Sequence, residues 1–525
     1  MKENQPIKKG KVTFKTYNQN QLNLLPSNLE ELIPSNHLVR VVNQVIDGIN
    51  LQILEKGYRG GGASSYHPRM MLKVIVYAYS TKIYSCRRID QALQENIHFM
   101  WLSANQKPDF RTINNFRSGR LKALIEEVFN QVLQFLIDNG YVKLEYYFVD
   151  GTKMRADANK YTHIWAKNTE RYKKHVQEKI KELLKYIDEE NEREEAEYGD
   201  NHLEEFGENS SLTSQEIQEK IDQINERIKN DHDQLSKKEI IKKNSQTKKL
   251  TQYAEKLKKY ENQERLLAGR RSYSRTDPDA TFMRMKNGDL LPNYTVINGT
   301  ENQYVINYTI GQSAGEAQDF PTHMEKLKTR TANKNPKNTI ADGAFGSEEN
   351  YTYLEKEDIA NYLKYSGIYY ENTKRYQQNR FHKDHFDYDA ESDSFICPND
   401  QRLIFKEEAT SRNANGFIQK QRVYQSQNCE GCIYADQCKK GKKGRNIQFS
   451  PAYEKYKDQV RQNYCSTTGI SMRKRRGWDV ETPFGDIKYN QNYSRFRLRG
   501  LEKVNIEWGL LCISHNLRKV AIQAA

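Results

Sequence analysis

The chain is organised around Arg475-Arg476-Gly477-Trp478-Asp479-Val480-Glu481-Thr482-Pro483-Phe484-Gly485-Asp486-Ile487-Lys488, a basic stretch with one glutamate and one lysine seven residues apart. Seven residues are about two helical turns, so we expect Glu481 and Lys488 to share a helix face, with Phe484 between them. From residue 461 to residue 500 there are nine Lys and Arg residues but only three acids. A carboxylate in such surroundings is held ionised, which suits a metal ion beside a polyphosphate ligand. By itself, the stretch also fits an amphipathic basic helix with an incidental glutamate.

Two further acids, Asp150 and Asp342, each follow a short apolar run and precede a glycine. The runs, residues 146–149 and 339–341, predict β-strands. Ligand carboxylates often lie where the backbone leaves a sheet, so both aspartates are candidate metal ligands. An Asp-Gly pair is also common in turns, and that alternative stays open from the sequence alone.

The net charge of +14 over 525 residues favours an anionic partner, nucleic acid before an anionic membrane surface. The length is enough for two to four domains with at least one sizeable core. There is no run of 18 apolar residues and no apolar signal-peptide region, so we expect no membrane partner. Seven cysteines, an odd number, indicate a reducing cytosol rather than a disulfide framework.

Short helices are predicted in the first 143 residues, after a basic arm at residues 1–33. They begin near Pro34, Pro68, Ser85 and Asp109, with Asp109 as the N-cap of the last, and a glycine-rich loop is expected at residues 57–65. Exposed arginines on such helices are typical of a helix-turn-helix DNA reader, and an ordinary helical domain with a solvated face fits equally well. The candidate DNA contacts are Arg87, Arg88, Arg111 and Arg117.

Residues 167–267 predict three charged amphipathic helices. Their apolar residues recur at spacings of three and four, which is the pattern of a coiled-coil seam. An acidic linker, residues 188–209, is expected between the first two helices, and we assign no chemistry to this arm. The seam residues are Val176, Ile180, Leu183 and Ile187, then Ile217, Ile221, Ile224 and Ile228, then Leu250, Tyr253, Leu257 and Tyr260.

A β pattern returns after residue 275. Residues 294–297 and 304–310 predict a strand pair that turns at Asn298-Gly299, followed by a helix at 322–330 and a strand at 359–365. Four other acids compete as ligands: Asp157, Asp277, Asp279 and Asp319. Asp277 and Asp279 flank a proline, where aspartate commonly makes local hydrogen bonds, and all four are held in reserve.

Four of the seven cysteines fall in residues 370–448, a polar segment with short β patterns. They are Cys397, Cys429, Cys432 and Cys438, and the middle two have C-x2-C spacing. Four thiolates suit a tetrahedral zinc ion, which would be structural because four thiolates leave no open position. Four unpaired reduced cysteines are the alternative.

The acids and the lysine together resemble those of the DDE transposases of bacterial insertion sequences. The segments Asp150-Gly151-Thr152-Lys153, Ala341-Asp342-Gly343-Ala344-Phe345-Gly346 and Val480-Glu481-x2-Phe484-Gly485-x2-Lys488 are similar to the three acidic motifs of that group. Arg499-Gly500-Leu501 and His515-Asn516-Leu517 are similar to its C-terminal tail. There is one departure: many relatives carry Tyr and Arg seven and four residues before the glutamate, whereas this chain has Lys474 and Gly477, with Arg475 and Arg476 adjacent.

The resemblance implies an α/β fold whose ribonuclease-H-like catalytic domain is built from residues 144–166, 271–369 and 449–525. It implies a helical DNA-binding domain at 1–143, with the arm (167–270) and the cysteine segment (370–448) as insertions. Asp150, Asp342 and Glu481 would hold two Mg²⁺ or Mn²⁺ ions about 4 Å apart. Lys488, Arg475, Arg476, Arg495 and Arg497 would contact DNA, together with the N-terminal arginines.

The implied activity is transposition, in which the protein binds the terminal inverted repeats of its own element and then cleaves and transfers DNA strands. The expected partners are double-stranded DNA of the element ends and the target, and a second copy of the chain in a homodimer, in the bacterial cytoplasm at the nucleoid. Two other classes remain open: a metal-dependent nuclease of similar fold that does not transpose, and a DNA-binding protein with vestigial acids. Terminal inverted repeats beside the reading frame would favour the transposase.

Overall fold

The computed structural model describes residues 28–50, 52, 55, 58, 65–198, 212–230, 236–439 and 444–524, and the side chains of these residues except at 191–198 and 227. Most of the predicted basic arm, most of the glycine-rich loop and the second half of the acidic linker lie outside the described residues. The described chain is mixed α/β with a helical N-terminal region, as predicted.

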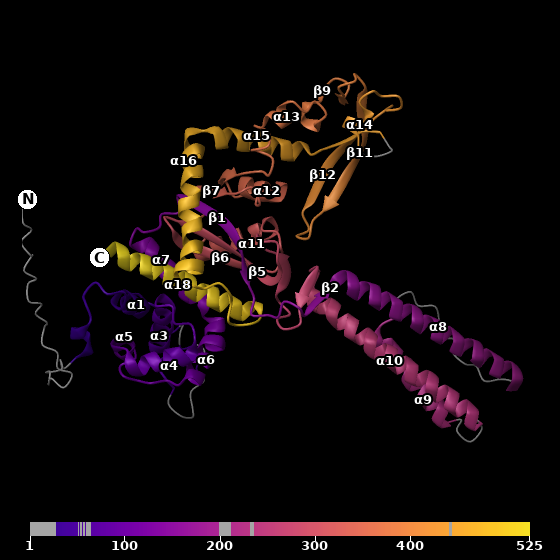
Figure 1. Cartoon of the computed structure of the whole chain (residues 1–525), viewed down its shortest axis with the longest axis horizontal. Helices are drawn as coiled ribbons and strands as arrows, with labels where there is room; N and C mark the ends of the chain where they lie inside the picture. The colour runs from indigo at the N-terminus through magenta and orange to yellow at the C-terminus, as the bar shows by residue number, and fades with distance from the viewer. Residues whose placement is uncertain are drawn as a thin grey trace, which may run out of the picture.

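A six-stranded sheet lies at the centre of the molecule (Figure 1). The long strand β5 (Leu290–Glu301) pairs antiparallel with β1 (Tyr146–Arg155) on one edge and with β4 (Thr281–Arg284) and β6 (Tyr304–Gly311) on the other. β7 (Asn338–Ala341) continues the sheet parallel to β1, and β8 (Ala360–Leu363) lies parallel to β7. The sheet therefore changes from antiparallel to parallel pairing at β1, the strand that carries Asp150.

The hairpin of β5 and β6 turns later than the sequence predicts. Both Asn302 and Gln303 have positive φ, at 52° and 63°, and form the turn. The prediction of a turn at Asn298-Gly299 is wrong because β5 runs on through both residues. Asn298 is fully buried and accepts a hydrogen bond from Trp508 Nε1 at 2.9 Å.

One face of the sheet packs against the N-terminal helices and the C-terminal helix α18 (Leu501–Ala524). A single hydrophobic core includes Val42, Ile75 and Phe129 of the N-terminal helices, Phe148 of β1 and Trp508 of α18. The N-terminal region therefore shares its core with the sheet. Its elements are η1 (Leu29–Leu32), α1 (Leu38–Asp47), α3 (Pro68–Ser80), α4 (Cys86–Glu95), α5 (Ile97–Leu102), α6 (Phe110–Ser118), η2 (Arg120–Ala123) and α7 (Ile125–Asp138).

The opposite face of the sheet is covered by α11 (Phe320–Arg330), α12 (Glu348–Lys356) and α15 (Pro451–Cys465). Tyr147 and Val149 of β1 point into this second core, whereas Phe148 points into the first. This alternation is the period of two expected for a strand buried on both faces. Asp150 follows directly, at the point where the apolar run ends.

The three helices of the predicted arm extend away from the body as a long bundle (Figure 1). They are α8 (Ala166–Tyr198), α9 (Ser214–Asn230) and α10 (Lys237–Leu267), and the short strands β2 (His163–Trp165) and β3 (Ser272–Ser274) pair at the base. The predicted seam residues lie in one hydrophobic cluster, which also includes Leu184 and Ala254. The linker prediction is wrong over residues 188–198, because α8 continues through them.

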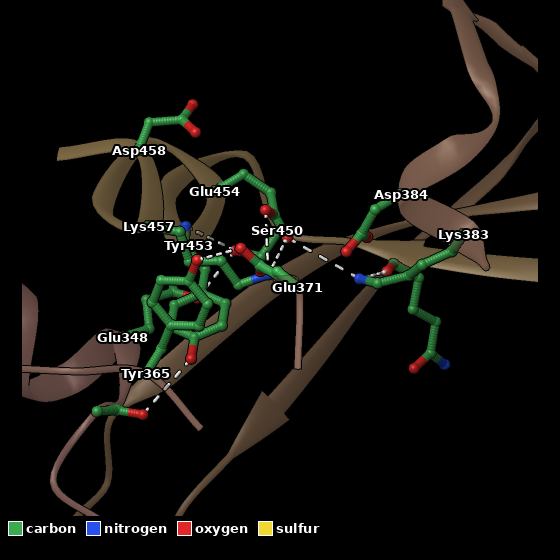
Figure 2. A network of polar contacts seen from close by, with 12 residues as sticks. Glu348, Tyr365, Glu371, Lys383, Asp384, Ser450, Tyr453, Glu454, Lys457 and Asp458 are labelled. Atoms are coloured by element: carbon green, nitrogen blue, oxygen red, sulfur yellow. Dashed lines mark hydrogen bonds and ion pairs between the residues drawn. The ribbon is translucent and has the colours of Figure 1, made fainter. Parts of the chain in front are cut away.

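The cysteine segment forms a separate five-stranded antiparallel sheet with its own small core. Its elements are α13 (Lys374–Gln377), η4 (Lys383–His385), β9 (Asp387–Asp389), β10 (Ser394–Ile396), β11 (Arg402–Arg412), β12 (Ile418–Ser426), α14 (Ala435–Cys438) and β13 (Asn446–Phe449). Figure 2 shows the polar contacts at its base, where Ser450 Oγ donates to Glu348 at 2.9 Å and Glu454 contacts Lys457 at 2.8 Å and Lys383 at 3.9 Å. These contacts join the segment to α12 and α15.

Among the described helices, none has the length and apolar character that crossing a membrane requires.

Candidate metal centre and its basic surroundings

Asp150 and Asp342 are brought together by strand register. Val149 of β1 pairs with Ala341 of β7 in the last pair of their parallel ladder, so the next residue on each strand is the aspartate. Asp342 follows the end of β7 as predicted, and its Oδ1 accepts a hydrogen bond from Ala344 N at 2.9 Å. The expectation that the strand ends at Asp150 needs correction, because β1 continues through it to Arg155, and the alternative of an Asp-Gly turn is excluded for the same reason. What ends at Asp150 is the pairing with β7.

A third carboxylate, that of Glu316, joins the two aspartates. Glu316 lies just before the turn η3 (Ala317–Asp319), and one oxygen from each of the three acids lies within 4.8 Å of the others. A Cβ atom at Gly151 would lie 2.3 Å from the Glu316 carboxyl carbon, so the absence of a side chain at Gly151 makes room for Glu316. Sequence reasoning missed Glu316, since neither its spacing nor its neighbours form a pattern.

Two of the three acids, Asp150 and Glu316, have raised pKa values. Burial raises the pKa of Asp150 to about 6; Arg476 counteracts this, while the charge of Asp342 adds to it. Burial, followed by the charges of Asp150 and Asp342, raises the pKa of Glu316 to about 7. A site for a hard divalent cation brings several carboxylate oxygens together, and before the cation binds their mutual repulsion and burial raise the pKa values. The residues present therefore fit a Mg²⁺ or Mn²⁺ ion.

Glu481 reaches the edge of this cluster from an irregular helix. Two π-helical segments, η5 (Gly477–Glu481) and η6 (Asp486–Asn490), follow α16 (Thr467–Arg476) and flank the short α17 (Thr482–Gly485). The side chain of Glu481 is 59% exposed. Arg476 lies between the acids, with its guanidinium nitrogens 3.6 Å from Asp150 and 3.2 Å from Glu481. The regular helix predicted here is wrong, and π turns of this kind are frequent at functional sites.

Lys488 lies near Asp150, farther along β1. Its ammonium group donates hydrogen bonds to Thr152 Oγ1 and, at 3.3 Å, to the carbonyl oxygen of Lys153. Burial and the nearby charge of Lys286 lower the pKa of Lys488 to about 8, while Asp150 acts in the opposite direction. Glu481 and Lys488 thus both border Asp150, and Phe484 between them is buried beside Trp508.

Other polar residues of the same stretch hold it in place. Asp479 is fully buried and accepts hydrogen bonds from the backbone of Asn302 at 3.1 Å and Gln303 at 2.8 Å. Arg475 is bound by Asp479 at 3.2 Å and by Asn302 at 2.7 Å, so its guanidinium anchors the helix to the β5–β6 turn. Of the two adjacent arginines, it is Arg476 that faces the acids.

His515 is part of the support for this helix. Its Nδ1 lies 2.9 Å from Asp486 and its Nε2 lies 2.9 Å from the carbonyl oxygen of Gln303. Burial alone would raise the pKa of Asp486, but His515 and Arg518 lower it to about 2. The histidine therefore ties α18 to η6, in agreement with a structural role.

The four reserve acids lie outside the cluster. Asp277 and Asp279 accept hydrogen bonds from Gly500 N at 3.1 Å and Leu501 N at 2.8 Å, and so they cap α18. Asp157 pairs with Arg495 at 3.3 Å and Arg499 at 3.0 Å. Asp319 accepts a hydrogen bond from Ser313 at 2.9 Å.

The predicted N-terminal DNA contacts divide into exposed and buried arginines. Arg87, Arg88 and Arg111 are exposed on α4 and α6. Arg117 is only 6% exposed and donates a hydrogen bond to the carbonyl oxygen of Tyr84 at 2.7 Å. The prediction for Arg117 is corrected, since its guanidinium lies inside the protein and is unavailable to DNA. Arg495 and Arg497, near the other end of the chain, are exposed.

The four cysteines predicted to bind zinc line one pocket of the second sheet, together with Ser426, Tyr434 and Arg445. Burial raises the pKa of Cys438, and the other three thiols add to this effect, so the four lie near one another. Among the described residues, however, no three of the four sulfur atoms all lie within 4.8 Å of each other. The pocket gathers the ligands without the close spacing of a preformed zinc site.

Two family models match the chain. A model described as "Transposase DDE domain" matches residues 396–521, which include the cysteines, Glu481 and Lys488. A model described as "Transposase domain (DUF772)" matches residues 27–119, the N-terminal helices. No curated protein matches the chain. The two matches support an insertion-sequence transposase of the DDE class, which confirms the resemblance drawn from the sequence motifs.

Proposed function

We propose that this chain binds the terminal inverted repeats of its own element and catalyses metal-dependent DNA strand cleavage and strand transfer. The observation that carries the proposal is the convergence of Asp150, Glu316 and Asp342 within 4.8 Å, with Arg476, Glu481 and Lys488 around them. A transposase must cut and join phosphodiesters, and clustered carboxylates within a basic surface are suited to that chemistry.

The proposed ligands are Asp150 and Asp342 from the sheet, Glu481 from the irregular helix, and Glu316. Two bound Mg²⁺ ions would supply activation of the attacking water or 3′-hydroxyl and stabilisation of the leaving oxygen. The aspartates and Glu316 hold the ligand oxygens close together without DNA. Glu481 is exposed and paired with Arg476, so its side chain is free to reorient toward the cluster when DNA and metal bind.

Arg476 and Lys488 are proposed to position the phosphate at the cut. In the DNA-free chain Arg476 partly neutralises Asp150 and Glu481, and a metal ion would take over that role. The arginine would then be available for the scissile phosphate, which it can contact with two parallel hydrogen bonds. Lys488, held by Thr152 beside Asp150, is the second phosphate contact.

The remaining parts of the proposal concern assembly. The mixed sheet with its acids at the β1–β7 pair supports a ribonuclease-H-like catalytic domain, into which the arm and the cysteine segment are inserted. Arg87, Arg88 and Arg111 support DNA binding by the N-terminal helices. We further propose a homodimer in the DNA complex, and a structural zinc ion at Cys397, Cys429, Cys432 and Cys438 that draws the four sulfurs together.

The zinc proposal has a direct test. Metal analysis of the purified protein should find one zinc per chain, and Cys432→Ser should lose it and lower the stability of the second sheet. Cys465→Ser is the control, because Cys465 is exposed and lies outside the pocket. A zinc-free wild type would end this part of the proposal.

The function itself is tested with a labelled duplex from the end of the DNA element that carries the gene. The wild-type protein should bind this end more tightly than a scrambled duplex, nick it in Mg²⁺ or Mn²⁺, and join it to a target plasmid. Nicking without joining would favour a nuclease. Binding with neither reaction would favour an inactive DNA-binding protein.

A further inference from the structure

An arginine-lined pocket lies at the far end of β1 from the two aspartates. It has a volume of about 360 Å³ and is lined by Arg155, Asn492, Ser494, Arg495 and Arg497. Each of these side chains offers N–H or O–H donors, and an arginine side chain cannot accept a hydrogen bond. The chemistry of the lining therefore selects an anion with several acceptor oxygens.

The pocket is built onto β1 by main-chain contacts. Arg155 and Arg495 form a parallel β-bridge, and Phe496 N donates to the carbonyl oxygen of Arg155 at 2.9 Å. Tyr493 and Phe496 are buried in the core, so the segment between them cannot shift freely. Ser494 and Arg495 of this segment and Arg497, directly after it, are exposed. The position of the pocket relative to Asp150 is therefore set by the sheet.

The charges in the pocket are only partly balanced. Asp157 pairs with Arg495 at 3.3 Å, and it also binds the neighbouring Arg499. Arg497 lies with its guanidinium carbon 5.1 Å from the centre of the Tyr84 ring. Within the described part of the chain, the Arg155 side chain makes no hydrogen bond or ion pair. Two guanidinium groups, those of Arg155 and Arg497, thus face the pocket without a carboxylate partner.

The spacing along β1 relates the pocket to the proposed site of cleavage. Arg155 is five residues beyond Asp150, which at about 3.3 Å per residue is about 17 Å along the strand. Phosphates of one DNA strand follow each other every 3.4 Å along the helix axis while the strand also winds around it, so a phosphate only a few steps from the cut lies within this span. Lys488 lies between the two places, beside Thr152 and Lys153.

We propose that this pocket binds one backbone phosphate of the DNA a few steps from the cut, and so fixes the register of the strand on the metal centre. The inference rests on the proposed function and adds a subsite to it. A guanidinium pair with Asn and Ser donors matches the non-bridging oxygens of a phosphodiester, and it reads no base.

The test combines a double variant with single-phosphate neutralisation. Arg155→Ala/Arg497→Ala is compared with the wild type and with Arg375→Ala, a control that removes one exposed positive charge on α13. Binding of the element-end duplex is measured against salt concentration. The double variant should lower the salt slope by about one unit, the value for one phosphate, while Arg375→Ala leaves the slope unchanged. The melting temperature of the double variant should match that of the wild type, because the side chains of Arg155 and Arg497 are both exposed.

A series of duplexes, each with one methylphosphonate in place of a phosphate, locates the contact. The wild type should lose several-fold in affinity at each contacted phosphate, including one a few steps from the cut, and the double variant should become insensitive at that position alone. If the double variant still binds the end duplex with an unchanged salt slope and an unchanged interference pattern, the pocket does not bind a phosphate. That result would leave the proposed function intact. A wild type that neither prefers nor cuts the end duplex would reject both.

Discussion

Asp150 and Asp342 differ from Glu481 in how the protein holds them. The two aspartates lie on neighbouring parallel strands, and strand register alone places them side by side. Glu481 lies on a π-helical segment, is 59% exposed and contacts Arg476. The difference shows that the fold alone brings the two aspartates together, and we propose that metal and DNA complete the arrangement by drawing in Glu481.

The largest expected effects are those of substitutions at Asp342 and at Glu481 on DNA cleavage. Asp342→Asn and Glu481→Gln should each reduce cleavage of the end duplex by at least about a thousand-fold, because both remove a proposed metal ligand, while end binding persists. They should differ in metal binding without DNA. Mg²⁺ should no longer raise the melting temperature of Asp342→Asn but should still raise that of Glu481→Gln. Wild-type nicking by Glu481→Gln would remove Glu481 from the site.

Glu316→Gln should have a smaller effect on cleavage, about 10- to 100-fold, because Glu316 supports a site that keeps three other carboxylates. The loss should shrink at high Mg²⁺ or Mn²⁺ concentration, since the variant weakens metal affinity. Glu502→Gln is the control, an exposed glutamate paired with Lys122. Equal cleavage by Glu316→Gln and the control at every metal concentration would limit Glu316 to packing beside Gly151.

Substitutions of Arg117 and Arg87, both predicted from the sequence as DNA contacts, should have different effects on stability and on DNA binding. Arg117→Ala should destabilise the fold by about 3 kcal/mol, because it removes a buried charged donor and leaves Tyr84 O without its partner. Arg87→Ala should leave the melting temperature unchanged but lower the salt slope of DNA binding by about one unit. Thermal unfolding and binding titrations of the two variants check both statements, and a destabilised Arg87→Ala would contradict the assignment.

The smallest predicted effect is a pH dependence of stability in the absence of metal. The pKa values of Asp150 and Glu316 are raised by folding to about 6 and about 7, so the folded chain holds more protons than the unfolded chain between about pH 4 and pH 7. Their contribution to stability is therefore present at low pH and is lost as the pH rises through 6 to 7.

Mg²⁺ should counteract this loss, because the cation binds the ionised carboxylates and stabilises the fold more at pH 8 than at pH 5. Glu316→Gln should remove part of the pH dependence that the wild type has without metal. Melting temperatures measured across this pH range, with and without Mg²⁺, provide the check. A wild type and variant with identical pH profiles would show that Glu316 does not titrate with the site.

The sequence predicts correctly those features that depend on residues close together in the chain. The seam of the arm follows from spacings of three and four, and the N-cap role of Asp109 is confirmed by its hydrogen bond from Thr112 N at 2.8 Å. Asp150 and Asp342 could be proposed as metal ligands because each follows a short apolar run. Their adjacency depends on strand order, which the motif spacing does not contain.

Residues brought in by the tertiary fold could not be predicted in the same way. Glu316 lies in a loop after β6 and reaches Asp150 only because the sheet folds it there. The π-helical segments around Glu481 depend on tertiary contacts. One example is the pair of hydrogen bonds that Asp479 accepts from the backbone of the β5–β6 turn. For Arg117 a signal did exist, because it lies four residues after the buried Ile113 on the same face of α6.

We propose that these carboxylates hold the divalent ions at which DNA is cut. Crystals of the protein with end DNA and Mn²⁺, measured for anomalous scattering, test it most directly. Two anomalous peaks about 4 Å apart are expected between Asp150, Asp342 and Glu481, with Glu316 beside them. A DNA complex with ordered Mn²⁺ elsewhere and no peak among these carboxylates would contradict it.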